Sequence, residues 1–159
     1  MIAEPASAAA DDGLLLDRQL CFKLYAASRA ITRAYKPMLT ALGLTYPQYL
    51  VMLVLWEWHQ QAPPAPTVKA LGERLLLDSG TLTPLLKRLE QLQLVQRRRS
   101  AEDEREVHLA LTGQGVALRE RALPLKTSLL CEYGSELEEI QALQQRLDGL
   151  LSRLRAPHN

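Results

Sequence analysis

Residues 78–99 read DSGTLTPLLKRLEQLQLVQRRR, an amphipathic segment that leads directly into three consecutive arginines. Its leucines recur at intervals of three and four residues, which is the spacing of one apolar face of an α-helix. Because Pro84 is tolerated only in the first turn of a helix, we expect this helix to begin near residues 79–81 and to end near Gln93. A shorter amphipathic helix is predicted at 68–76, and the two helices with the short polar turn between them form a helix-turn-helix pattern.

The hydrophobic period changes immediately after this second helix. In residues 105–111, apolar side chains alternate with polar or small ones, as expected of a β-strand with one buried face. Residues 94–99 form a second short run, and the polar sequence SAEDE at 100–104 separates the two. The pair predicts a β-hairpin, and a hairpin that directly follows a helix-turn-helix is called a wing.

The outward face of the second helix carries hydroxyl, amide and cationic side chains, which can hydrogen-bond base edges and phosphates in a major groove. Residues 87–99 contain five basic side chains and one acidic side chain, although the net charge of the whole chain is only +1. An ordinary solvated helix face would explain the charges, but it leaves the arginine run and the order of helix, turn, helix and wing unexplained. An arginine at the tip of a narrow hairpin also suits a minor groove. We therefore expect DNA contacts from these side chains: Ser79, Thr81, Thr83, Lys87, Arg88, Gln91, Arg97, Arg98, Arg99 and Arg105.

The bulk composition is that of a soluble globular chain with one main domain. The 159 residues are 47% hydrophobic and 23% charged, which is enough apolar material for a core. Residues 1–13 are small, acidic and Pro-containing and lack the features of a signal peptide, so we expect a disordered tail. The sequence contains no run of about 18 apolar residues, so no membrane span is expected. Two cysteines without an export signal suit the reducing cytoplasm.

Helices are also predicted on both sides of the helix-turn-helix, so the expected fold is mainly α. The first runs from an N-cap at about Asp17 to Leu42, and Pro37 bends or ends it. The second, at 45–59, has Pro47 in its first turn. Its apolar side chains point in nearly all directions, which indicates a central, buried helix.

A Pro-rich connector, 60–67, leads into the helix-turn-helix and has no helix of its own. After the wing, helices are predicted at 112–133, with a kink at Pro124, and at 135–154. In the last helix, leucine and isoleucine repeat at threes and fours over about 20 residues, a stripe too long to cover a small core. We expect this stripe to bind a second copy of the chain, most simply in a homodimer.

The sequence resembles the winged helix-turn-helix core of the MarR family of repressors. The resemblance is carried by DSGTLTPLLKRLEQLQLV and by DEREVHLALT at 103–112, where D-x-R and the following L-x-L-T are similar to the family's wing signature. It extends over roughly residues 15–155 and departs at Ala101, where the family often has Pro. It implies that Asp103 pairs with Arg105 at the wing, so that Arg105 reaches the minor groove.

The same resemblance implies a single MarR-like domain at 14–159. Within it, the winged helix-turn-helix at 66–112 would lie between dimerisation helices at 14–59 and 113–155. The assembly implied is a triangular homodimer that binds double-stranded DNA at a pseudo-palindromic operator.

The first predicted helix carries a cysteine on a stripe that also holds tyrosines. At about 100° per residue, Tyr25 and Tyr35 lie within roughly 40° of the direction of Cys21. Along the axis, however, Tyr35 is about 21 Å from Cys21 at about 1.5 Å per residue, so the two cannot touch within one straight helix. In an antiparallel dimer, Tyr35 of one chain can face Cys21 of the other.

A phenol that donates to the sulfur stabilises a thiolate, and a position in the first turn adds the helix dipole. Asp17, one turn earlier, opposes this effect. A thiolate attacks a peroxide oxygen and forms a sulfenic acid, which a second thiol converts into a disulfide. Taken alone, such a cysteine is more often a small core residue, and Tyr35 and Tyr46 are more often core aromatics.

Cys21 with Tyr35 and Tyr46 at these spacings is similar to the organic hydroperoxide-sensing branch of the MarR family, the Ohr regulators. The resemblance implies that Cys21 is the peroxidatic thiol and that Tyr35 and Tyr46 of the partner subunit hydrogen-bond it. Tyr25 is a third, weaker candidate. Cys131 is similar in place to the resolving cysteine of two-cysteine members, which forms a disulfide across the dimer; the alternative is a buried structural cysteine. One-cysteine members use a small external thiol instead.

The expected function is redox-sensing repression of transcription. The reduced dimer would bind its operator, and an organic hydroperoxide entering an apolar pocket beside the first two helices would oxidise Cys21. A disulfide to Cys131 would draw the helices together, so that the recognition helices no longer fit two half-sites about 34–36 Å apart. The reaction is stoichiometric, so we expect a sensor without a cofactor rather than an enzyme.

Two other functions are compatible with the sequence. A MarR-type repressor released by a small phenolic ligand would respond even with Cys21 blocked. A two-cysteine thiol peroxidase would turn over peroxide without operator affinity, and it leaves the wing unexplained. Metal sensing is poorly supported, because His59, His108 and His158 show no ligand spacing with either cysteine.

Overall fold

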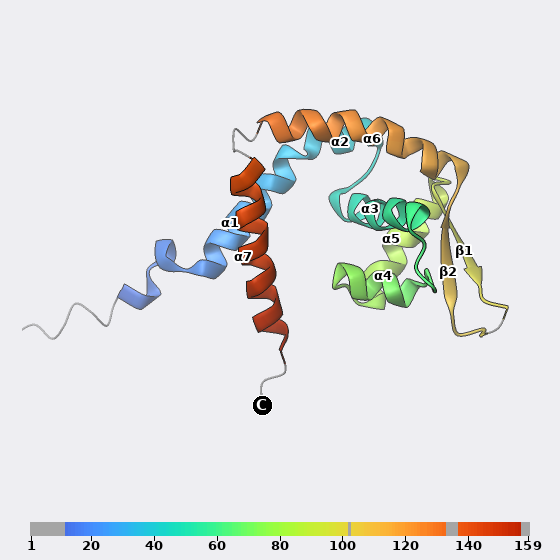
Figure 1. The fold of residues 1–159 in the computed structure, drawn as a ribbon, viewed down its shortest axis with the longest axis horizontal. Coiled ribbons are helices and arrows are strands. Elements are labelled where there is room, and N and C mark those ends of the chain that lie inside the picture. Colours follow the sequence, from blue (N-terminus) through green and yellow to red (C-terminus); the bar gives the residue numbers. More distant parts are fainter. Residues whose placement is uncertain (1–11, 102, 133–136, 157–159) are drawn as a thin grey trace, which may run out of the picture. The chain divides into compact units, whose positions relative to one another are not determined.

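The structure is a computed structural model that describes residues 12–101, 103–132 and 137–156, with only the backbone for 12 and 128–132. It divides into two compact units, Met1–Ala122 and Leu123–Asn159. Two 3-10 turns, Asp12–Leu14 and Leu16–Arg18, come before the first α-helix. The elements that follow in chain order (Figure 1) are α1 (Leu20–Ala34), α2 (Lys36–Leu42), α3 (Tyr46–Gln60), α4 (Val68–Leu75), α5 (Ser79–Gln91), β1 (Val95–Arg99), β2 (Val107–Leu111), α6 (Gly113–Glu132) and α7 (Leu137–Arg155).

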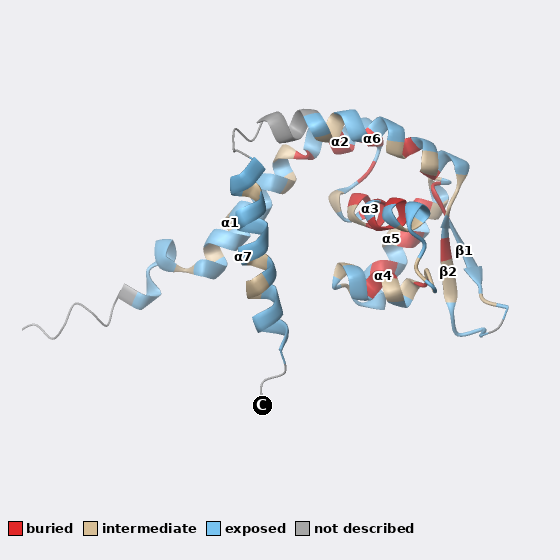
Figure 2. Cartoon of the chain, in the orientation of Figure 1, coloured by how far each residue is buried: buried red, intermediate tan, exposed pale blue. Residues whose placement is uncertain are grey.

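Helix α3 is the centre of the first unit and buries more hydrophobic side chains than any other helix that the structure describes. Val51 and Met52 are completely buried, and Tyr49 and Trp56 are nearly so (Figure 2). Helices α4 and α5 and strand β2 all contact α3, which places the helix-turn-helix and the wing beside it. Leu53 is 41% exposed, however, so the predicted burial of this helix on nearly all sides is wrong on that side.

Strands β1 and β2 form a two-stranded antiparallel hairpin in which Val95 pairs with Leu111. The end of the Pro-rich connector reaches the same hairpin, because the N–H of Leu109 donates to the carbonyl of Pro66 at 2.8 Å. Each strand begins one or two residues later than the sequence predicts. The predicted fold class, mainly α with a winged helix-turn-helix, is confirmed.

Helix α5 begins at Ser79 because Asp78 caps it. Asp78 accepts the backbone N–H of Thr81 at 2.8 Å and the Thr81 hydroxyl at 3.2 Å, and these bonds lower the pKa of the carboxyl group. Pro84 therefore lies in the second turn of α5, and the expectation that it marks the first turn is wrong. The helical carbonyl that loses its N–H donor is that of Gly80.

Two non-glycine residues with left-handed backbone bracket α5. Leu76, with φ of 59°, ends α4, and Gln93, with φ of 56°, follows α5. Helix α5 consequently ends at Gln91, two residues earlier than predicted. Thr112 holds the turn after it, since its hydroxyl donates to the carbonyl of Gln93 and its N–H to that of Leu94.

The N-terminal helices begin and break at places that the sequence did not predict. Helix α1 begins at Leu20, whereas Asp17, the expected N-cap, lies in the preceding 3-10 turn and forms an exposed ion pair with Lys23 at 3.8 Å. The break falls at Tyr35, two residues before Pro37. Pro37 thus lies in the first turn of α2, where its missing N–H has no helical partner to lose.

The apolar stripes of α1 and α7 are uncovered in the single chain. Neither helix has a buried residue among those described, and Leu20, Leu137 and Leu154 are each at least 59% exposed (Figure 2). Helix α6 continues through Pro124, where the sequence predicts a kink, and the boundary between the two units falls just before this proline.

No single helix in the described ranges is long and apolar enough to cross a membrane. Helices α2 and α3 together have the length and composition, but they bend by 68° at the break between them. Met38 and Leu39 of α2 are buried, as are six apolar residues of α3, so these side chains belong to the core of the first unit.

Candidate DNA-binding surface and redox site

The side chains that the sequence predicts to contact DNA all lie in the first unit and are all exposed. Helix α5 buries Leu82, Leu86 and Leu89 and leaves its hydroxyl, amide and cationic side chains in solvent. The wing adds the arginines of β1 and the charged residues near its tip. The exposed set comprises Ser79, Thr81, Thr83, Lys87, Arg88, Gln91, Arg97, Arg98, Arg99, Asp103 and Arg105.

The hydroxyl groups of α5 already act as donors within the helix. Thr81 donates to Asp78, and Thr83 donates to the carbonyl of Ser79 at 2.7 Å. Both hydroxyls can therefore accept hydrogen bonds from the amino groups of cytosine or adenine. Lys87 and Arg88 supply donors for guanine or phosphate.

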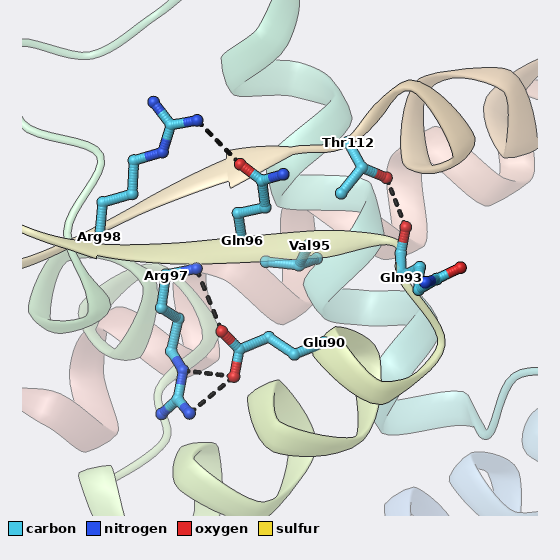
Figure 3. Close-up of a pocket in the computed structure, with 7 residues that line it drawn as sticks. All are labelled: Glu90, Gln93, Val95, Gln96, Arg97, Arg98 and Thr112. Atoms are coloured by element: carbon cyan, nitrogen blue, oxygen red, sulfur yellow. Dashed lines mark hydrogen bonds and ion pairs between the residues drawn. The ribbon is translucent and has the colours of Figure 1, made fainter.

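The arginines of β1 are not equivalent. Figure 3 shows Arg97 on the side of the strand that faces α5 and Arg98 on the other side, as strand alternation requires. Arg97 forms an ion pair with Glu90 of α5 at 2.6 Å, and its Nε and backbone N–H donate to the same carboxylate at 2.7 and 3.2 Å. Arg98 instead donates to Gln96 at 2.9 Å. Arg97 is thus already bound to an acidic group, which the sequence did not predict.

The wing tip is a tight, hydrogen-bonded turn. The carboxylate of Asp103 accepts the backbone N–H of Arg105 at 2.9 Å, and the Asp103 carbonyl accepts the N–H of Glu106 at 2.9 Å. The N–H of Ser100 closes the turn on the carbonyl of Glu106 at 2.9 Å. Asp103 therefore shapes the backbone that presents Arg105, whose side chain is exposed.

Cys21 lies in the first turn of α1 as a free, exposed thiol. No hydrogen bond reaches its sulfur from any residue within the described ranges. Tyr25, one turn further along, is 57% exposed and accepts a hydrogen bond from Arg29 at 2.8 Å. The Arg29 guanidinium also lies over the Tyr25 ring, 5.4 Å from its centre.

The two tyrosines expected to serve the thiol lie together in the structure. The rings of Tyr35 and Tyr46 meet edge to face at 5.5 Å, and Tyr49 lies 5.9 Å from Tyr35. Burial raises the pKa of Tyr35 and of Tyr46, and it raises that of Tyr49 to about 12. All three phenols are therefore protonated donors at neutral pH. The sequence reasoning missed Tyr49, although its position one turn after Tyr46 was a usable signal.

A pocket of about 560 Å³ opens between α1, α2 and the start of α3. Tyr46 lines it, together with Arg29, Arg33 and Lys36, and its described lining contains no acidic side chain. The sequence predicted an apolar pocket beside the first two helices. The predicted pocket adjoins the dimer interface, so its apolar character stays a prediction; in the single chain, Leu39 and Leu44 supply apolar surface beside the basic side chains.

Cys131 belongs to the last turn of α6, in the second unit, and its side chain lies outside the described residues. Its predicted resolving role stays a prediction. Among the side chains that the structure does describe, no group of three His, Cys, Asp or Glu could hold a metal ion.

Comparison with known proteins identifies the family. A family model described as transcriptional regulator SarA/Rot matches residues 33–121, more than half of the chain. The chain belongs to this family. It is 48% identical to the organic hydroperoxide resistance transcriptional regulator of Bacillus subtilis (strain 168), over 90% of this chain and 94% of that protein. The predicted resemblance to MarR-type regulators of the organic hydroperoxide-sensing branch is confirmed by this relative.

Solved structures place this SarA/Rot-type regulator beside AbfR of Staphylococcus epidermidis. Reduced AbfR bound to DNA is 37% identical, with a TM-score of 0.75 over 90% of this chain and 96% of that one. The disulfide form of AbfR is 36% identical, with a TM-score of 0.63 over 89% of this chain and 96% of that one. The roles of individual DNA-contact and redox residues in the present regulator stay predictions.

Proposed function

We propose that this regulator is a homodimeric repressor that binds operator DNA when reduced and releases it when an organic hydroperoxide oxidises Cys21. The observation that carries the proposal is the exposed, free thiol in the first turn of α1, in a chain that is 48% identical to an organic hydroperoxide resistance regulator. The thiolate is the form of a cysteine that attacks peroxides, and an exposed sulfur is accessible to them.

Operator binding is supported by the exposed hydroxyl, amide and basic side chains of α5 and the wing. AbfR, at 37% identity, has been solved in its reduced form bound to DNA. We assign the side chains of α5 to base edges and phosphates in the major groove and Arg105 to the minor groove. Asp103 supports Arg105 by holding the backbone of the tip.

Dimer formation is supported by the uncovered apolar stripes of α1 and α7. A second copy that covers these stripes brings Tyr35 and Tyr46 of one protomer toward Cys21 of the other, if the two α1 helices run antiparallel. The protonated phenols then donate hydrogen bonds to the thiolate. Tyr25 is held by Arg29 instead, which makes it a weaker candidate for this role.

Oxidation of Cys21 proceeds in two steps. The Cys21 thiolate attacks the terminal peroxide oxygen, the O–O bond breaks, and the products are a Cys21 sulfenic acid and an alcohol after proton uptake. The Cys131 thiol of the other protomer then attacks the sulfenic sulfur, forming a disulfide and releasing water. AbfR has likewise been solved in a disulfide form. Each event uses one regulator thiol pair, so the protein acts as a stoichiometric sensor in the cytoplasm, without a cofactor and not as an enzyme.

Release follows from geometry. A disulfide across the dimer moves the helices that carry the two α5 helices, and two half-sites on one face of DNA must stay one turn, about 34–36 Å, apart. A change of a few ångströms in that separation prevents one of the two α5 helices from reaching its half-site. The dimer then no longer binds both half-sites at once, and it releases the DNA.

A gel-shift titration tests the proposal. The reduced wild type should bind operator DNA, lose it on addition of cumene hydroperoxide, and regain it with dithiothreitol. Cys21→Ser should bind equally well and stay bound under peroxide, because the nucleophilic sulfur is gone. Release of Cys21→Ser by peroxide would overturn the proposal.

The resolving role of Cys131 is tested separately on a non-reducing gel. Peroxide-treated wild type should run as a covalent dimer, and Cys131→Ser should run as a monomer. A dimer-sized band in the variant contradicts this pairing. A response that survives alkylation of Cys21 points instead to a repressor released by a small non-oxidising ligand.

A further inference from the structure

The ion pair between Glu90 and Arg97 joins the two elements that are proposed to contact DNA. Glu90 lies near the end of α5, and Arg97 is the middle residue of β1. Three contacts connect them: the ion pair at 2.6 Å, the Nε bond at 2.7 Å and the backbone N–H bond at 3.2 Å (Figure 3). The Arg97 and Glu90 side chains are only 34% and 29% exposed, so solvent screens this pair less than a fully exposed one.

The wing needs such a connection. A two-stranded hairpin is marginally stable by itself, so its direction depends on what holds its base. The turn between α5 and β1 contains the left-handed Gln93, and Thr112, the residue after β2, closes it by donating to the Gln93 carbonyl. A shallow pocket of about 430 Å³ lies between these two connections, lined by Glu90, Gln93, Arg97 and Thr112 among others. Glu90 and Arg97 close one side of that pocket, and Thr112 closes the other.

We propose that Glu90 and Arg97 are positioning residues that fix the direction of the wing relative to α5, and that Arg97 acts through Glu90 and not through a phosphate. The proposal rests on the proposed DNA-binding function. Its physical basis is that the Arg97 guanidinium already has a carboxylate partner on the α5 side of the strand: Nε and one terminal nitrogen both contact Oε2 of Glu90, and Oε1 accepts the backbone N–H of Arg97. Arg98, on the other side, has a neutral glutamine partner. Arg97 and Arg98 therefore differ by strand alternation: Arg97 holds the wing against α5, and Arg98, on the other side of β1, is available to DNA.

Neutralising the acidic partner gives a test in which the two readings predict opposite signs. If Glu90 is only a negative charge near DNA, Glu90→Gln should tighten operator binding, because one repulsion is removed and Arg97 is released toward the phosphates. If Glu90 fixes the wing, Glu90→Gln should weaken operator binding by about threefold to tenfold. Fluorescence anisotropy with a labelled operator duplex measures the dissociation constant. Equal or tighter binding by Glu90→Gln overturns the proposal.

The salt dependence of binding separates Arg97 from its neighbour. The slope of log K against log salt is negative, and loss of one phosphate contact lowers its magnitude by about 0.9. Arg98→Gln should lower the slope by this amount, whereas Arg97→Gln should weaken binding and leave the slope unchanged. A slope decrease in Arg97→Gln equal to that in Arg98→Gln overturns the proposal.

Charge-conserving and charge-exchanged variants guard against effects on folding. Arg97→Lys keeps the charge but loses the planar fork, so it should weaken binding, while Arg98→Lys should bind like the wild type. The exchanged pair Glu90→Arg with Arg97→Glu should recover most of the affinity lost by Glu90→Gln. If Arg97→Lys binds like the wild type, the positioning role is wrong. If the wild type itself fails to bind the duplex, the proposed function fails instead, and the two failures are distinguishable.

Discussion

The winged part of the chain and its terminal helices differ in how much of their apolar surface the single chain covers. Around the helix-turn-helix, Leu71, Leu82 and Leu89 are at most 1% exposed. In the terminal helices, Leu20 and Leu137 are 59% and 67% exposed, and no described residue of α1 or α7 is buried. The winged part completes its own core, whereas the terminal helices leave apolar side chains exposed.

The free energy available from burying the exposed leucines is consistent with a homodimer. Each leucine that leaves water contributes about 1.5–3 kcal/mol, and association of two chains costs an estimated 4–15 kcal/mol. A dimer covers each stripe twice, once in each protomer. A handful of leucines per chain is therefore sufficient for a stable homodimer.

The largest expected effect comes from placing a charge on the uncovered stripe. Leu143 of α7 is 58% exposed in the single chain, and we expect it to be buried in the dimer. Leu143→Asp should then cost on the order of 3–5 kcal/mol of dimerisation free energy, because it buries an unpaired carboxylate. Sedimentation velocity should show monomers, and operator binding should be lost.

Gln145→Asp is the matched control for this change. It adds the same charge to the same helix at an exposed position, two residues and about 200° away from Leu143. It should leave the dimer intact. If Leu143→Asp also sediments as a dimer, α7 is not the partner surface.

A smaller effect is expected where the winged part is already filled. A Cβ at Gly115, at the start of α6, would lie 2.1 Å from the backbone carbonyl oxygen of Leu94, and that carbonyl cannot move without shifting β1. Gly115 also accepts a hydrogen bond from the Trp56 indole at 2.8 Å. Gly115→Ala should therefore lower the free energy of unfolding by about 3 kcal/mol, measured by urea denaturation.

Gly113, the first residue of α6, supplies the comparison. A Cβ there meets nothing within 4 Å. Gly113→Ala should raise the free energy of unfolding by about 0.5 kcal/mol, since alanine loses less conformational entropy in a helix. Similar destabilisation by both substitutions would show that the close approach at Gly115 is not the cause.

An effect smaller than that of Gly115→Ala is expected from the dependence of stability on alkaline pH. Burial, with smaller contributions from Tyr35 and Tyr46, raises the pKa of Tyr49 to about 12, above its ordinary value of 10.0. Between these values the unfolded chain has lost the phenolic proton and the folded chain has kept it. Stability is therefore complete below pH 10 and falls as the pH rises toward 12, by about 1–2 kcal/mol. Thermal unfolding at pH 9 and pH 11 should show a smaller difference for Tyr49→Phe than for the wild type.

The winged part was predictable because each of its elements carries its own period and its own boundary signal. Leucines at threes and fours predict α5, and alternation predicts the hairpin. The start of α5 at Ser79 lies within the predicted range, but Pro84 falls in the second turn and not in the first, because the two hydrogen bonds from Thr81 to the Asp78 carboxylate fix the N-cap. The assignment to a family of regulators followed from the same residues and their wing signature.

The candidate site was less predictable, since its contacts join positions that the sequence pattern does not relate. The arginine run has the pattern of a single basic patch. The sequence does not indicate which side of β1 faces α5, or that Glu90 of α5 contacts an arginine on that side. Cys21 and Tyr35 depend on a second copy of the chain. The pocket combines basic and apolar side chains because residues of α1, α2 and the start of α3 converge there.

The two left-handed residues that bracket α5 have a consequence for how this chain tolerates changes in length. Leu76 and Gln93 fix the backbone just before and just after α5. An extra residue in α5 could therefore not be accommodated by unwinding one end of the helix. One inserted residue would rotate everything downstream by about 100° and shift it by about 1.5 Å, turning the wing away from the groove. We therefore expect the Pro-rich connector and the hairpin tip to tolerate insertions and deletions, and the segment from 76 to 93 to require a constant length.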